Sequence, residues 1–310
     1  MTRVTNHQLV SRPSNPGSEN TSHVSINLNR RPHDRYHANA RTLTVQLLTG
    51  TIGALVDGID LTQPLSRSET EFITATLAEH QVVFVPDQHL SAVELHRLAA
   101  QFGPLTPHPV DDVASIPEGV TTISDSATRP PDAFDWHSDL SWIERPPRLG
   151  FLNAVDTPPK GGDTIWASGF GMYERLGGRL QQICDDLSVV HRPSPDLIRS
   201  VRRTRGDAVA VQLLNEFPPV AHPMVRKHAL TGRKSLWLSP LDASHIESLD
   251  DYDSDVLLDV LHRGIEDPDV QIRWRWRPGD VAIWDETSTC HRELGDHYPQ
   301  PRTMRRCTVD

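Results

Sequence analysis

The chain has 310 residues, enough for one large domain or two small ones, and it can bury a substantial hydrophobic core. Hydrophobic residues make up 37% of the sequence and charged residues 23%, which is ordinary for a soluble protein. The formal net charge of -10 argues against a nucleic-acid-binding protein, because such a protein would present a basic surface. No apolar run approaches the roughly 18 residues of a membrane span, and the N-terminus lacks a signal-peptide core.

The cysteines bear on the redox compartment. Cys184, Cys290 and Cys307 are widely spaced and odd in number. This pattern favours reduced thiols over a disulfide framework, so we expect a cytoplasmic protein.

The N-terminal segment differs from the rest of the chain. Residues 1–40 are rich in Asn, Ser, Arg, Pro and His, and show no sustained hydrophobic period. Such a segment cannot bury enough apolar surface to offset its ordering entropy, so we predict a flexible tail followed by a single domain over 41–310. A regulatory or partner-binding tail is the alternative interpretation.

The ordered part is predicted to begin with a strand at 43–47, where the residues alternate in polarity, and with a short strand and turn at 54–60. The spacing of apolar residues then predicts a helix over 66–79, with Ser68 available as its N-terminal cap. A compact apolar strand follows at 82–85.

A second helix is predicted at 92–102, with Ser91 as its cap. Residues 188–222 are irregular and arginine-rich, and we interpret them as either a mobile lid or a solvated loop. Further strands are predicted at 120–123, 149–155, 164–166, 236–238, 271–277, 281–284 and 304–309, and further helices at 171–187 and 253–264.

Many short strands with few helices indicate a mainly β fold with flanking helices, either a β-sandwich or a jelly roll. No strands alternate regularly with long helices, and no glycine-rich phosphate loop follows a strand. A doubly wound parallel sheet is therefore not expected.

The segment around Trp136 carries the chemistry. His137 and Asp139 are two residues apart, so on an extended backbone their side chains project to the same face. Alone, such a pair is most often solvated or joined by a buried hydrogen bond. With His291 as a third ligand, the set would match the facial triad of non-haem Fe(II) oxygenases, which leaves open positions on the metal.

Several motifs occur in an ordered set: Trp136-His137-Ser138-Asp139, Gly161-Gly162-Asp163-Thr164, Trp276-Arg277-Pro278-Gly279-Asp280 and Ile283-Trp284-Asp285, followed by His291, Arg302 and Arg306. Together they resemble the taurine dioxygenase (TauD/TfdA) family of Fe(II)- and 2-oxoglutarate-dependent oxygenases over roughly 43–310. The resemblance implies a double-stranded β-helix, with Fe(II), 2-oxoglutarate and O2 as the cofactor and cosubstrates.

The same resemblance implies roles for individual residues. His137, Asp139 and His291 match the iron ligands, which in this family are also the catalytic centre. Thr164 matches the hydroxyl that binds 2-oxoglutarate, and Arg302 matches the arginine that pairs with its far carboxylate.

Four further positions match substrate contacts of the taurine enzyme. Arg306 matches the arginine that binds the sulfonate, and His108 matches a histidine of the substrate pocket. Asp111 and Ala133 stand where the taurine enzyme has a tyrosine and an asparagine. These two departures argue against taurine itself as the substrate.

The parity of the last strand supports this assignment. Arg302, Met304 and Arg306 are separated by even numbers of residues and would share one face, whereas Arg305 would point elsewhere. By the same parity, Cys290 lies on the opposite face from His291 and is not expected to be a ligand.

The resemblance implies oxidation of a C–H bond in a small anionic organic molecule, such as a natural-product intermediate, with release of succinate and CO2. Hydroxylation, desaturation and epoxidation all remain open. The alternatives are a taurine, alkylsulfonate or alkylsulfate dioxygenase in sulfur scavenging, and a non-catalytic jelly-roll binding protein with a structural metal. We expect neither a nucleic acid nor a membrane as partner, and a homo-oligomer is compatible with the sequence.

Overall fold

The computed structural model describes residues 42–110, 117–131 and 135–310. The tail predicted at 1–40 lies outside these residues. Among the residues described, no helix is long and apolar enough to cross a membrane.

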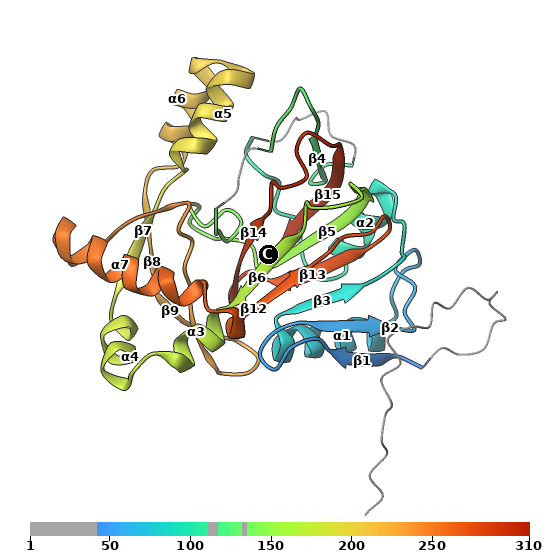
Figure 1. Cartoon of the computed structure of the whole chain (residues 1–310), viewed down its shortest axis with the longest axis horizontal. Helices are drawn as coiled ribbons and strands as arrows, with labels where there is room; N and C mark the ends of the chain where they lie inside the picture. Colours follow the sequence, from blue (N-terminus) through green and yellow to red (C-terminus); the bar gives the residue numbers. More distant parts are fainter. Residues whose placement is uncertain (1–41, 111–116, 132–134) are drawn as a thin grey trace, which may run out of the picture. The chain divides into compact units, whose positions relative to one another are not determined.

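Seven strands form the main sheet, in the order β1-β2-β3-β13-β5-β15-β4 (Figure 1). Neighbouring strands are antiparallel except β2 and β3, which are parallel. The strands are β1 (Thr44–Leu47), β2 (Ala54–Asp57), β3 (Val82–Val85), β4 (Thr121–Asp125), β5 (Leu149–Asp156), β13 (Val281–Asp285) and β15 (Arg302–Val309).

A second, three-stranded antiparallel sheet has the order β12-β6-β14, with β12 at Gln271–Trp274, β6 at Thr164–Ser168 and β14 at Thr289–Glu293. The two sheets share one hydrophobic cluster, to which the main sheet contributes Phe84 and Met304 and the smaller sheet Trp166. The Phe84 ring stacks on Trp274 with centroids 4.2 Å apart. The inner core of the domain therefore lies between these sheets.

Helices cover the outer faces of both sheets. Alternate strand residues such as Val83 and Val85 pack with apolar residues of α1 (Arg67–His80) and α2 (Ala92–Ala100) on one side. Their neighbours Val82 and Phe84 face the inner cluster instead, as the two-residue period of a strand requires. On the other side, α3 (Gly169–Arg175), α4 (Gly178–Asp185) and α7 (Asp251–Ile265) pack against the smaller sheet.

The first helix lies within one residue of the predicted bounds at each end, but its predicted cap is wrong. Its N-cap is Ser66, not Ser68, and Ser66 and Glu69 form a reciprocal capping box. The second helix has the predicted cap, because Ser91 and Glu94 form the same motif.

The expectation that 188–222 is irregular is wrong. This segment forms β7 (Ser188–His191), α5 (Pro195–Arg205), α6 (Asp207–Glu216) and β8 (Val220–Pro223). Ser194 caps α5 and Pro195 occupies its first turn, where a missing amide proton costs nothing. Strands β7 and β8 pair in a sheet with β11 (Ala243–Ile246).

Other boundaries also differ. The helix predicted at 171–187 is two helices, since the chain leaves the helical conformation at Leu176 and Gly177. The strand predicted at 236–238 is β10 (Lys234–Leu236), which pairs with β9 (Val225–Lys227). A short 3-10 turn at Pro268–Val270 precedes β12, which ends at Trp274.

Close packing against Trp284 leads to a stability prediction. Gly150 pairs with Trp284 across β5 and β13, and a Cβ at Gly150 would overlap Cε2 and Cζ2 of the indole. We expect Gly150→Ala to lower the free energy of unfolding by about 1–3 kcal/mol in urea titrations, the usual cost of overpacking a core.

Gly264 offers a matched control, because it is exposed in α7 and an added Cβ would meet nothing within 4 Å. Gly264→Ala should raise the free energy of unfolding by up to about 1 kcal/mol, through helix propensity. Equal effects at the two positions would contradict the packing argument.

Candidate metal centre

Two segments far apart in the sequence meet at His137 and His291. The His137 amide donates to the His291 carbonyl at 2.9 Å, and the His291 amide donates back to the His137 carbonyl at 2.8 Å. Their imidazole centroids lie 4.3 Å apart. His291 belongs to β14, so the smaller sheet holds the loop that carries His137.

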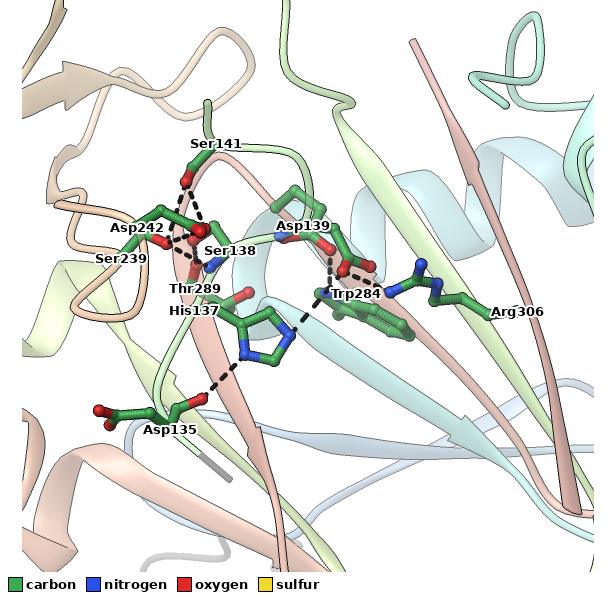
Figure 2. Close-up of polar contacts among 11 residues, drawn as sticks. Asp135, His137, Ser138, Asp139, Ser141, Ser239, Asp242, Trp284, Thr289 and Arg306 are labelled. Atoms are coloured by element: carbon green, nitrogen blue, oxygen red, sulfur yellow. Dashed lines mark hydrogen bonds and ion pairs between the residues drawn. The ribbon is translucent and has the colours of Figure 1, made fainter. Parts of the chain in front are cut away.

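His137, Asp139 and His291 each direct one donor atom to a common point. These three atoms lie within 4.8 Å of one another. His137 Nδ1 lies 2.9 Å from the Asp135 carbonyl oxygen, to which it donates (Figure 2). In the neutral imidazole this bond leaves the lone pair of Nε2 for a metal ion.

Asp139 is a buried carboxylate kept charged by its surroundings. Burial alone would raise its pKa, but Arg306, with His291 and His137, lowers the pKa to about 2. Arg306 Nη1 lies 2.6 Å from Asp139 Oδ1 (Figure 2). Asp139 Oδ2 is buried and has no hydrogen-bond partner among the residues described, so it can accept a cation.

His291 is held as a neutral imidazole. Burial, followed by the nearby His137, lowers its pKa to about 3. Its ring packs against Trp284 and Trp166, with centroids 5.1 Å and 6.4 Å away. Cys290 is also buried but belongs to the cluster on the far face of the smaller sheet, which confirms the parity argument.

Glu286 was not identified from the sequence. It accepts hydrogen bonds from the Asp139 amide at 3.1 Å and from Trp284 Nε1 at 2.6 Å. Burial, with added repulsion from Asp139, raises its pKa well above the ordinary value. Glu286 thus fixes the backbone of Asp139, a metal-ligand candidate, and its raised pKa disfavours a second charge beside that carboxylate.

Asp242 was also missed. Ser141 and Ser239 donate to its Oδ2 at 2.9 Å and 3.1 Å, and Ser239 Oγ accepts from the Ser138 amide (Figure 2). Burial raises the pKa of Asp242 to about 6, although His137 and both serines oppose the rise. This network fixes the loop on both sides of Asp139.

A second group of predicted residues, Thr164 and Arg302, lines the same cavity. Thr164 of β6 pairs in register with Glu293 of β14. Trp276 Nε1 donates to Thr164 Oγ1 at 2.9 Å. Arg302 is 1% exposed, donates from Nε to the Gly162 carbonyl at 3.1 Å and forms an ion pair with Glu293 at 3.0 Å.

The face of β15 follows the predicted parity. Arg302 and Arg306 both line the cavity, and Met304 between them is fully buried in the cluster between the sheets. Arg305 points away and donates to the Leu90 carbonyl at 2.9 Å.

One cavity of about 890 Å³ joins all these groups. Its wall includes the three ligand candidates, Thr164, Arg302, Arg306 and His108, together with Leu140, Trp142, Leu197 and Val201. The last two belong to α5, so the segment expected as a lid or loop supplies a helical wall. Asp111 and Ala133 lie outside the residues described.

Comparison with known proteins agrees with this arrangement. The profile of the family described as "Taurine catabolism dioxygenase TauD, TfdA family" matches residues 44–308. The chain is 32% identical over 272 residues to an alkylsulfatase of Acinetobacter baylyi, covering 86% of this chain and 84% of that protein. It is 31% identical over 278 residues to an alpha-ketoglutarate-dependent sulfate ester dioxygenase of Pseudomonas putida, covering 87% and 90%.

A more distant relative is pentalenolactone F synthase of Streptomyces avermitilis, 26% identical over 287 residues, covering 86% of this chain and 94% of that protein. Among solved structures, a taurine dioxygenase from Burkholderia xenovorans superimposes with a TM-score of 0.73 at 30% identity, covering 86% and 90%. The chain therefore belongs to the TauD/TfdA family and is a 2-oxoglutarate-dependent dioxygenase that uses Fe(II) and O2.

Proposed function

We propose that this dioxygenase oxidises a C–H bond of a small anionic organic molecule, by hydroxylation, desaturation or epoxidation, with 2-oxoglutarate converted to succinate and CO2. The observation that carries the proposal is the convergence of His137, Asp139 and His291 beside Arg306 in one cavity. The two sheets packed face to face support a double-stranded β-helix, the jelly-roll form of the fold. Three free, buried cysteines support a reducing, cytoplasmic location.

In this proposal His137, Asp139 and His291 hold Fe(II). When bound, the iron would activate O2 for oxidation of the substrate, and three protein ligands leave room for 2-oxoglutarate and O2. The orphaned Asp139 Oδ2, the charged state of that carboxylate and the neutral state of His291 all fit a divalent cation.

Thr164 and Arg302 would bind the far carboxylate of 2-oxoglutarate. The Trp276 indole can only donate, so its bond to Thr164 Oγ1 leaves the threonine proton free for a carboxylate oxygen. Arg302 is fully buried, and its planar group suits a carboxylate.

Arg306 and His108 would bind the anionic group of the substrate. The Arg306 side chain is 18% exposed, at the cavity wall next to the metal centre. Leu140, Trp142 and Leu197 would contact an apolar part of the molecule. Such a lining favours a substrate with an organic body larger than that of taurine.

An alkylsulfate dioxygenase is the second candidate function. It is favoured by similarity to two proteins that act on sulfate esters, each covering more than four fifths of this chain. A natural-product intermediate remains the first candidate, because Asp111 and Ala133 replace the substrate contacts of the taurine enzyme.

Removal of either histidine should abolish tight metal binding. With Mn(II) as the probe in anaerobic calorimetry, we expect His137→Ala and His291→Ala to weaken metal binding by at least about 100-fold. This loss of affinity exceeds the usual effect of removing a residue that only contacts a metal ligand. His245→Ala removes an exposed histidine and should leave the affinity unchanged. A folded His291→Ala variant with the affinity of the native protein would contradict the ligand assignment.

Arg306→Ala should raise the substrate KM roughly tenfold to hundredfold. It should also increase the fraction of 2-oxoglutarate that is converted to succinate without oxidation of the substrate. The reason is loss of charge-assisted hydrogen bonds worth about 1.5–3 kcal/mol. Arg305→Ala is the matched control on the opposite face of β15. Unchanged KM and coupling in Arg306→Ala would show that the substrate does not contact this side chain.

The substrate class is tested by substrate-triggered succinate formation in the Fe(II)-loaded enzyme. We expect anionic molecules with an apolar body to stimulate succinate release at least about tenfold over the rate without substrate, while their uncharged analogues do not. Alkyl sulfates of increasing chain length, taurine, phenoxyacetate and terpenoid carboxylates distinguish the candidate functions. Equal stimulation by charged and uncharged analogues would refute an anionic substrate.

A further inference from the structure

Arg302 does not face the cavity as an unpaired cation. Its Nη1 lies 3.0 Å from Glu293 Oε1 and 3.9 Å from Asp125 Oδ2. His297 Nε2 approaches the same Asp125 oxygen at 3.3 Å. The side chains of Arg302, Asp125 and His297 are at most 6% exposed, whereas Glu293 is 21% exposed.

Glu293 sits at this position because of strand register. It follows His291 by two residues on β14, so both side chains project to the same face. Across the sheet it pairs with Thr164, and Thr164, Glu293 and Arg302 all line the cavity. Its carboxylate therefore occupies the end of the pocket where the far carboxylate of 2-oxoglutarate would bind.

The charges in this cluster are already balanced. Even with His297 protonated, two cations face the two carboxylates of Asp125 and Glu293. A third carboxylate brought to Arg302 would have no cation of its own and would repel Glu293 at close range in a poorly solvated site.

We propose that Glu293 is a specificity-determining residue of the cosubstrate pocket, whose carboxylate competes with the far carboxylate of 2-oxoglutarate for Arg302. This inference rests on the proposed role of Arg302 as the cosubstrate anchor. Glu293 weakens binding of the dicarboxylic 2-oxo acid but not of a 2-oxo acid of equal length without the far carboxylate.

A positioning role for Glu293 is less well supported by the contacts. Arg302 is fixed from the other side, where Nε donates to the Gly162 carbonyl. Gly162 has a positive φ of 71°, and an added Cβ would lie 2.9 Å from Arg302 Cδ. The backbone of residue 162 thus packs directly on the arginine and orients it without help from Glu293.

The test is anaerobic calorimetry on the Mn(II)-loaded protein. The two probes are 2-oxoglutarate and 2-oxopentanoate. We expect Glu293→Gln, and Glu293→Ala as a second variant, to bind 2-oxoglutarate at least about tenfold more tightly, because one like charge is removed at close range. Binding of 2-oxopentanoate should change less than about twofold, within the scatter expected when no charge is involved.

Glu174→Gln is the matched control, because it breaks a Glu–Arg ion pair of 2.6 Å with Arg233 away from the cavity. It should change neither affinity. Unchanged or weaker 2-oxoglutarate binding by both Glu293 variants overturns the proposal, as does equal tightening toward the two probes, which would indicate relief of crowding. Failure of the native Mn(II) protein to bind either oxo acid would instead refute the proposed function, and the inference with it.

Discussion

The site depends on two backbone hydrogen bonds that join His137 and His291. Neither segment supplies all three ligand candidates by itself. His137 and Asp139 lie in a loop, and His291 lies in a short strand. Their mutual pairing sets the spacing of the imidazoles before any ligand arrives. The entropy of ordering the loop is therefore lost on folding and not on metal binding, which favours a preorganised centre.

Two buried carboxyl groups, Asp139 and Glu286, lie beside that pairing, and their surroundings shift their pKa values in opposite directions. Asp139 is charged because Arg306 outweighs the effect of burial, and its pKa falls to about 2. At Glu286 burial and the charge of Asp139 outweigh the effect of Arg306, so the pKa is raised instead. Opposite pKa shifts in neighbouring groups suit them to different tasks, here one candidate metal ligand and one structural acceptor. Two charged carboxylates in the same space would repel each other strongly.

The sequence predicted those features that depend on periodicity within one segment. Arg302, Met304 and Arg306 share one face through the two-residue period of strand β15. His137 and Asp139 also converge as expected, although their segment is an isolated bridge followed by a turn and not a strand. Glu286, Asp242 and Trp276 could not be found in this way, because their roles arise from contacts between distant segments. Helices α5 and α6 were missed because the arginines of 199–205 suggested a solvated loop, although Ser194 and Pro195 gave a start signal for α5 and apolar residues recur through α6. The true cap Ser66 was also readable, since Glu69 stands three residues after it and not after Ser68.

Strand geometry also explains why family membership does not determine which anion the pocket around Arg302 prefers. The strand that supplies His291 must place residue 293 on the same face, opposite Thr164, whatever its identity. The fold therefore places the side chain of residue 293 in the cavity wall beside Arg302, while the residue type sets the charge found there. Glutamate at 293 keeps Arg302 paired in the absence of ligand, which avoids leaving a buried cation alone. An anion that binds there must pair with Arg302 more favourably than Glu293 does. Selectivity is therefore set by the difference in free energy between these two ion pairs and not by the arginine alone.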